Sequence, residues 1–417
     1  MIHFALRNGE EADRTGLPPP PRTPYRRQGI CGVLRLLGIR YGRCDLRAGA
    51  VARTEPELPS ADAREALSDP RFSSELTPLG LVLPPSGDRT LSEELRFRQP
   101  GTFIECDPPE HTRLRQMVAN EFTAKRMKEF QPRVEEILHE CLDALEAGGP
   151  TVDLVKSFAL PFPSKVICEL LGMPFDETFD FVGRTQIMTN VNAPLEQLIE
   201  ARNALRGRMR EVVSEHRRAP GDSLLGRLIR DHGDQATDEE LVGIGNLLLV
   251  AGHETTANML GIGTLALLRN PDQLALLRDD PAIVEDGIEE LVRYLSIPNH
   301  GEIRTALEDL TINGQLIRQG EQVLVSIPSA NRDELRFPDP DRLDLRRPPR
   351  ANLAYGYGLH YCVGTALARM EMQLAFPALF RRFPELRLAV PFESIPFRRS
   401  NVTYGVHSLP LTWSTQR

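Results

Sequence analysis

One long apolar segment constrains the fold of this chain more than any other feature. Thr237-Asp238-Glu239-Glu240 is a capping-box sequence, in which Thr237 is the N-cap and Glu240 lies three residues later. The helical pattern that follows continues to about Arg269, and Asn270-Pro271 ends it. At about 1.5 Å per residue such a helix is roughly 50 Å long, enough to cross a whole domain. We therefore expect a large, mainly helical unit organised around it.

The same segment is apolar enough to be mistaken for a membrane span. Between Leu241 and Leu268, however, a span would have to carry Asn246, His253 and Glu254 into hydrocarbon, which is costly. We therefore expect a buried core helix and no membrane association.

Composition narrows the class of protein further. The formal net charge of −8 gives no support to a nucleic-acid-binding function. The six cysteines include no C-x-x-C pair and no regular spacing, so a disulfide scaffold is not indicated. The N-terminal sequence M-I-H-F-A-L-R-N-G-E-E has no secretory apolar region. These features predict a cytoplasmic protein.

The chain from residue 61 onward is largely helical, with short β signals at 310–312 and 323–325. Residues 1–60 differ, because they contain four consecutive prolines and many arginines. Since there is no internal repeat and no clear linker, we predict one domain over 61–417 after an atypical segment over 1–60. Further helices are expected over 63–67, 126–146, 164–171, 196–217, 272–278 and 283–295, and after Cys362.

The sequence Y-G-Y-G-L-H-Y-C-V-G-T-A-L-A-R-M-E, residues 355–371, carries the clearest chemical signal. Gly356 and Gly358 permit tight backbone turns. Cys362 stands just before a helix, where backbone N–H groups and the helix dipole favour a thiolate. Gly364 would let a flat ligand approach that helix. A lone cysteine in such a loop would usually be inert, but the whole sequence argues against that interpretation.

This sequence resembles the haem-binding loop of cytochromes P-450, written F-G-x-G-x-H-x-C-x-G-x-x-L-A-R-x-E, and departs from it at Tyr355, where the family usually has Phe. The resemblance implies that Cys362 is the iron ligand of heme b (iron protoporphyrin IX). It also implies that Tyr355, Gly356 and Gly364 lie against the haem and that His360 binds a propionate. An anionic thiolate donates electron density to iron and favours O–O cleavage.

A second motif, A-G-H-E-T-T at 251–256, lies midway along the long helix. Ala251 and Gly252 are expected to leave an open patch where O2 fits, and Glu254 beside Thr255 forms an acid–alcohol pair that can relay protons. Taken alone, Thr255 could simply bond to a backbone carbonyl and Glu254 could reach solvent. The motif resembles the oxygen-activation sequence A-G-x-(D/E)-T-T of the same family, which implies a catalytic role for both.

Several charged residues complete the predicted site. Glu290 and Arg293, three apart, would by spacing alone form a surface pair. They resemble the family's E-x-x-R motif, which implies a buried ion network with Arg342 as the later arginine partner. The sequences D-P-P-E-H-T-R-L-R and R-T-A-L-E-D resemble two further family segments, which implies that His111, Arg115 and Arg304 meet haem propionates rather than solvent.

The resemblance extends from about Ala61 to Trp413 and implies the cytochrome P-450 fold, mainly α with a minor β region, with haem between the long helix and the helix after Cys362. It implies a monooxygenase of the soluble actinobacterial subgroup that inserts one oxygen atom from O2 into a largely apolar small molecule, such as a polyketide, a terpenoid or a xenobiotic. Electrons would come from NAD(P)H through a ferredoxin reductase and ferredoxin. Candidate substrate contacts lie in 77–104, 297–300 and 401–404, and candidate docking cations are Arg113, Arg347 and Arg350.

Two other functions stay open. A peroxide-driven oxygenase would not need the Glu254–Thr255 pair, and a non-catalytic haem-binding auxiliary protein would not need the complete Cys362 loop either. Residues 28–60 also fail to match the strand-forming segments that the family has there. Their Arg, Gly and Ala content is what a shifted reading frame in GC-rich DNA gives, so we hypothesise that this segment is frame-shifted or strongly diverged.

Overall fold

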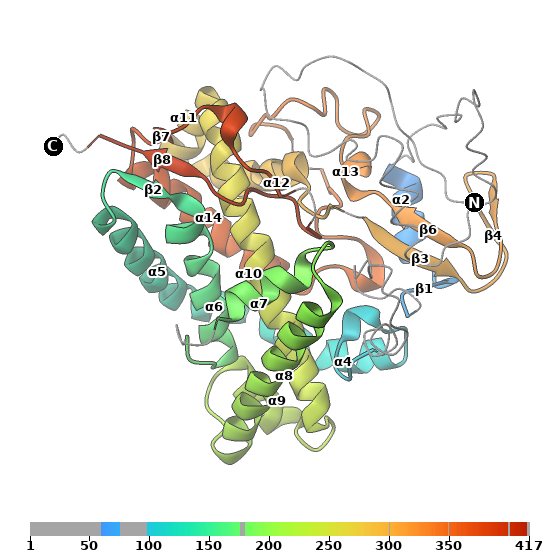
Figure 1. Ribbon diagram of the computed structural model, residues 1–417. Coiled ribbons are helices and arrows are strands. Elements are labelled where there is room, and N and C mark those ends of the chain that lie inside the picture. Colours follow the sequence, from blue (N-terminus) through green and yellow to red (C-terminus); the bar gives the residue numbers. More distant parts are fainter. Residues whose placement is uncertain are drawn as a thin grey trace.

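The computed structural model describes residues 60–75, 98–175, 180–299, 301–348, 350–398 and 401–414. The hypothesis about residues 28–60 falls outside this part of the chain, apart from Ser60. Helix α10 runs through the middle of the described structure, with α5, α6, α8 and α9 on one side and the strands β1, β3, β4 and β6 on the other (Figure 1). The helices are α2 (Ser60–Ser68), α4 (Glu110–Ala119), α5 (Ala124–Ala147), α6 (Pro161–Leu171), α7 (Phe181–Thr189), α8 (Leu195–Arg218), α9 (Leu224–His232), α10 (Asp238–Arg269), α11 (Pro271–Asp279), α12 (Val284–Leu295), α13 (Ile327–Ala330) and α14 (Thr365–Arg382).

The strands are few and short, and all of their pairings are antiparallel. One sheet has the order β1–β3–β6, a second has the order β2–β8–β7, and β4 pairs with β5. The prediction of a mainly α fold with a minor β region is therefore confirmed. The bounds are β1 (Phe72–Ser73), β2 (Thr151–Asp153), β3 (Glu302–Ala306), β4 (Leu310–Ile312), β5 (Gln315–Ile317), β6 (Gln322–Val325), β7 (Arg387–Leu388) and β8 (Pro410–Thr412).

Helix α10 begins at the predicted capping box. The Thr237 hydroxyl accepts a hydrogen bond from the Glu240 amide at 3.2 Å, and the Glu240 carboxylate accepts one from the Thr237 amide at 2.8 Å. Most of its side chains are buried, because α10 packs against α6, α8 and α14. None of the helices in the described residues has the length and apolarity that a membrane crossing requires.

Helix α14 follows the Cys362 loop and contains a proline. Pro377 lacks a backbone N–H and can end a helix, yet α14 continues to Arg382. The residues around the proline, Phe376 and Leu379 among them, are buried. Their packing against neighbouring helices outweighs the loss of one backbone hydrogen bond.

Candidate active site

The Cys362 loop presents its sulfur at the N-terminus of α14. The Cys362 amide donates to the Tyr355 carbonyl at 2.9 Å, which closes the loop, and the cysteine side chain remains exposed. Surrounding protein raises the pKa of the Cys362 thiol, while the Thr365 hydroxyl, the Gly364 amide and the Arg115 charge lower it. A metal ion bonded to the sulfur would deprotonate it outright.

Four of the predicted haem-contacting residues converge beside this loop. The imidazole rings of His111 and His360 lie with their centroids 4.4 Å apart, and Arg115 donates to the Tyr361 carbonyl at 2.5 Å. Burial lowers the pKa of His360 to about 3, and the neighbouring His111, Arg304 and Arg115 act in the same direction. Burial and Arg115 also lower the pKa of His111. This cluster of basic groups therefore suits the binding of an anion.

The segment of α10 that carries A-G-H-E-T-T differs in one respect from the expectation. Ala251 is exposed, as predicted. The open patch does not extend to Gly252, because a Cβ atom there would lie 2.7 Å from Ile167 of α6. Gly252 thus permits close helix packing. The Thr255 hydroxyl donates to the Ala251 carbonyl at 2.8 Å and is only half-buried.

Glu254 does not reach solvent, and its hydrogen-bond partners were not predicted from the sequence. Its carboxylate is buried and accepts hydrogen bonds from Thr189 at 2.9 Å and from Arg398 at 2.6 Å. Arg398 also donates to Asn258 at 3.1 Å. Burial raises the pKa of Glu254, while Arg398 and Thr189 oppose that rise. The sequence offers only the basic pair Arg398-Arg399 as a signal for this residue.

The neighbouring His253 is a core histidine, fully buried within α10. Its Nδ1 lies 2.6 Å from the Leu249 carbonyl and its Nε2 lies 2.9 Å from the Thr185 hydroxyl. Burial lowers the pKa of His253 to about 4.

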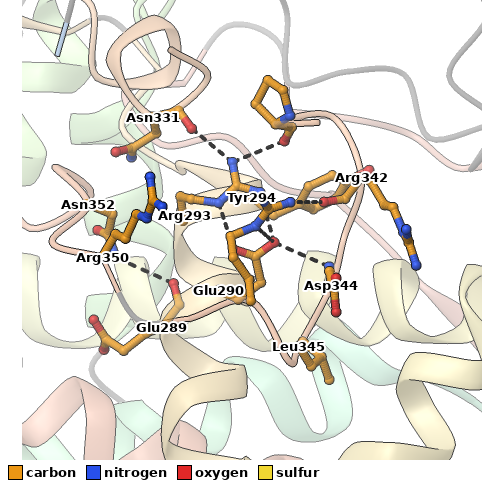
Figure 2. Close-up of polar contacts among 12 residues, drawn as sticks. Glu289, Glu290, Arg293, Tyr294, Asn331, Arg342, Asp344, Leu345, Arg350 and Asn352 are labelled. Atoms are coloured by element: carbon orange, nitrogen blue, oxygen red, sulfur yellow. Dashed lines mark hydrogen bonds and ion pairs between the residues drawn. The ribbon is translucent and has the colours of Figure 1, made fainter. Parts of the chain in front are cut away.

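Glu290 and Arg293 form a buried network on α12 (Figure 2). Arg293 donates to both carboxylate oxygens of Glu290, at 2.6 and 2.8 Å. It also donates to the carbonyl groups of Asn331 and Pro340, at 2.8 and 3.0 Å. The network therefore fixes the irregular stretch that precedes the Cys362 loop.

The prediction that Arg342 is the third member of this network is wrong. Arg347 takes that position, because its Nε donates to Glu290 at 3.0 Å. Arg342 is exposed, and Figure 2 shows its guanidinium pointing away from Glu290. Arg342 contributes only its backbone carbonyl, which accepts a hydrogen bond from Arg347 at 3.1 Å. Three arginines stand within six residues here, and spacing alone could not choose among them.

Comparisons with known proteins agree with this geometry. The family model described as Cytochrome P-450 matches residues 185–396. Vitamin D3 dihydroxylase from Streptomyces griseolus is 43% identical over 358 residues, which cover 84% of this chain and 86% of that protein. Nocardicin C N-oxygenase from Nocardia uniformis subsp. tsuyamanensis is 40% identical over 355 residues, covering 84% and 87%. The crystal structure of CYP105P1 in complex with filipin I superposes with a TM-score of 0.80 at 39% identity, covering 86% of this chain and 89% of that one.

These matches and the fold define a haem-dependent oxygenase. The chain belongs to the cytochrome P-450 family, and it is a monooxygenase of that family whose relatives are actinobacterial.

Haem is the cofactor of this family, and the residues present fit it. His111 Nδ1 and Nε2 and His360 Nδ1 are buried without a hydrogen-bond partner among the described residues. Such groups call for an acceptor, and two carboxylates next to Arg115 would supply it. A Cβ atom on Gly364 would meet nothing within 4 Å, so a flat group can approach the loop there.

Proposed function

We propose that Cys362 binds the iron of heme b and that the chain inserts one oxygen atom from O2 into a largely apolar small molecule. The observation that carries this is the exposed Cys362 sulfur beside buried ring nitrogens of His111 and His360 that have no hydrogen-bond partner among the described residues. Arg115 and Arg304 would hold the two carboxylates of the haem, while Tyr355, Gly356 and Gly364 would line its sulfur side. When bound, a thiolate-ligated haem supplies the binding and reductive activation of O2.

The remaining chemistry belongs to side chains of α10. Reductive cleavage of O2 consumes two protons, and these must arrive in a site that excludes bulk water. Glu254 can hold a proton at its buried carboxylate, since burial raises its pKa. Thr255 can pass one on through its hydroxyl, and Ala251 leaves room on the same helix face. Glu254 and Thr255 are therefore the proposed proton-carrying residues.

The substrate is proposed to be a secondary metabolite such as a polyketide or terpenoid, or a xenobiotic. The described parts of two of the three candidate contact segments, 297–299 and 401–404, lie side by side, because the Tyr404 amide donates to the Ile297 carbonyl at 2.7 Å. The names of relatives support a lipophilic molecule, since one is a vitamin D3 dihydroxylase and another was crystallised with filipin I. Titration with such compounds should produce a Soret shift when they enter the haem pocket.

Electrons are proposed to come from NAD(P)H through a ferredoxin reductase and a ferredoxin. Of the predicted docking cations, Arg113 pairs with Glu240 and Arg347 lies in the Glu290 network, which leaves Arg350. Arg64 and Arg336 both donate to the Ala351 carbonyl, at 2.5 and 2.9 Å, and Arg350 donates to the Arg336 carbonyl. No described carboxylate forms an ion pair with these three arginines. They suit an acidic partner such as a ferredoxin.

The deciding experiment is the difference spectrum of the dithionite-reduced protein with and without CO. We expect the strongly red-shifted Soret band of a thiolate-ligated haem, and its loss in Cys362→Ser. A band typical of histidine or protonated-thiol ligation would refute Cys362 as the thiolate ligand. Turnover with peroxide but not with redox partners would favour the peroxide-driven alternative. Normal CO binding without any turnover would favour the auxiliary protein.

A further inference from the structure

Two threonines on α7 face two consecutive residues of α10. Thr185 and Thr189 lie four residues apart and so share one face of α7. Thr185 contacts the His253 imidazole, and the Thr189 hydroxyl lies 2.9 Å from each carboxylate oxygen of Glu254. The end of α7 is thus joined to the proposed proton-carrying carboxylate by a direct polar contact.

The C-terminal segment that carries Arg398 holds the same end of α7. The Thr189 carbonyl accepts a hydrogen bond from the Val402 amide at 2.9 Å, and Asn190 forms a β-bridge with Asn401. Three parts of the chain that are distant in sequence therefore meet at Glu254. One of them, α7, is a short helix with only two buried residues, Phe181 and Thr185.

We propose that Thr189 is a positioning residue for Glu254, through which the docking of α7 onto α10 sets the geometry of the proton-carrying carboxylate. This inference rests on the monooxygenase function proposed above. It adds a residue outside the A-G-H-E-T-T motif to the proton relay, and it makes delivery of protons depend on where α7 lies.

The chemistry of the hydroxyl suits this role. When Glu254 is ionised, Thr189 donates to it, as in the structure. When Glu254 takes up a proton, the acid can donate to Thr189, which turns its own proton to the Thr185 carbonyl, 3.1 Å away. The Thr189 hydroxyl can therefore hydrogen-bond Glu254 in both protonation states.

Arg398 cannot do the same. A guanidinium has donors but no acceptor and stays charged, so it favours only the ionised form of Glu254. Asn258 fixes it in place, since the Asn258 amide oxygen accepts from Arg398. Arg398 is therefore the anchor of the carboxylate, and Thr189 is the partner that permits uptake and release of a proton.

The position of α7 should therefore determine whether O2 is used to oxygenate the substrate or is released as H2O2. If α7 moves away from α10, Glu254 loses Thr189 but keeps Arg398. Each NAD(P)H then supplies two electrons that, with two protons, reduce O2 to released H2O2, and no oxygen atom enters the product. Less product per NAD(P)H and more H2O2 are the expected signature.

The test compares three variants of the full-length, haem-loaded protein. Thr189→Val removes the hydroxyl and keeps the shape, Thr189→Ser restores it, and Thr311→Val is a matched control at an exposed position of β4. Hydrogen exchange in the resting enzyme measures the docking of α7. We expect amides of Phe181–Thr189 to exchange about tenfold faster in Thr189→Val than in wild type, and to be unchanged in the other two.

Turnover supplies the second readout. Product per NAD(P)H should fall about threefold or more in Thr189→Val, with H2O2 rising to match, and should recover in Thr189→Ser. Equal values in Thr189→Val and Thr311→Val would overturn the proposal, and so would faster exchange without any loss of product yield. A wild-type protein that makes no product with any redox partner would refute the monooxygenase function instead, and the exchange comparison would still decide whether Thr189 holds α7 to Glu254.

Discussion

Arg398 and Glu254 form a buried ion pair at 2.6 Å, although 144 residues separate them in the chain. Both side chains are almost fully buried, at 6% and 2% exposed. A buried pair of this kind adds little net stability, but removing one partner leaves an uncompensated charge in the interior. The pair therefore makes the oxygen side of the site dependent on the correct folding of the C-terminal segment.

Arg398→Met should lower the free energy of unfolding by about 3–5 kcal/mol at neutral pH. The pKa of Glu254 is already raised by burial, and loss of Arg398 raises it further. At low pH Glu254 is protonated in the folded state of both proteins, so the deficit should be small there. It should grow once the pH rises above the pKa of Glu254 in the folded wild type, because the wild-type carboxyl then ionises beside Arg398 while that of the variant stays protonated. Urea unfolding of the variant and the wild type at a series of pH values measures this difference in free energy of unfolding.

Arg387→Met, at an exposed position of β7, is the matched control and should change the free energy of unfolding by less than about 0.5 kcal/mol. A deficit in Arg398→Met that stays the same at every pH would show that packing, and not the charge of Glu254, explains the loss.

Arg347 lies inside the Glu290–Arg293 network and the Arg342 side chain lies outside it. Substitutions at the two positions therefore compare the free energy of unfolding lost inside and outside the network. Arg347→Ala removes the donors to Glu290 and to the backbone carbonyls of Pro338 and Arg342, and should cost about 3 kcal/mol. Arg342→Ala should cost less than about 0.5 kcal/mol, because that side chain is exposed. Urea unfolding and the yield of haem-loaded protein measure both. A loss in Arg342→Ala as large as that in Arg347→Ala would contradict this assignment.

Features encoded locally could be predicted from the sequence. The capping box at Thr237 and the Asn270-Pro271 terminator fix the two ends of α10 within a residue, because neighbours in the chain supply the signals. The four-residue spacing of His111 and Arg115 is likewise a local signal, because it puts both on one face of α4. Such predictions need no knowledge of what packs against the helix.

Contacts between distant segments could not be predicted in this way. Thr189 and Arg398 reach Glu254 only because α7 and the C-terminal segment pack over α10. The role of Gly252 depends on Ile167 of another helix. Arg347 replaces Arg342 because of how the irregular stretch before the Cys362 loop folds around Glu290. In each case the local sequence pattern does not distinguish the residue that makes the contact from its neighbours, and tertiary packing determines which one does.

Tyr355 is the one departure from the family's loop sequence, and its hydroxyl is buried without a hydrogen-bond partner among the described residues. Burial raises the pKa of Tyr355, so the hydroxyl stays protonated. Tyr355→Phe should therefore raise the free energy of unfolding by about 1 kcal/mol, since it removes an unsatisfied polar group. The ring, which packs under Arg369 at 5.0 Å, would be kept.

Urea unfolding and the reduced CO spectrum together test this prediction, and the Soret position should not move. Tyr357→Phe is the control, because the Tyr357 ring is exposed beneath Arg64 and its hydroxyl should contribute little. Destabilisation by Tyr355→Phe would mean that the hydroxyl has a favourable partner in the haem-loaded protein.

Glu371 on α14 is 1% exposed, and burial raises its pKa well above the ordinary value of 4.5, with the Thr256 hydroxyl opposing. The folded state therefore keeps the proton that the unfolded state releases as the pH rises. Wild-type stability should fall by about 1.4 kcal/mol per pH unit above that value, until the folded group also ionises. Glu371→Gln has no proton to lose, so its advantage in free energy of unfolding should grow as the pH rises above about 5. Glu385→Gln, at an exposed position, is the control and should show no such trend. A difference between Glu371→Gln and wild type that does not change with pH would mean that Glu371 is ionised in the folded protein.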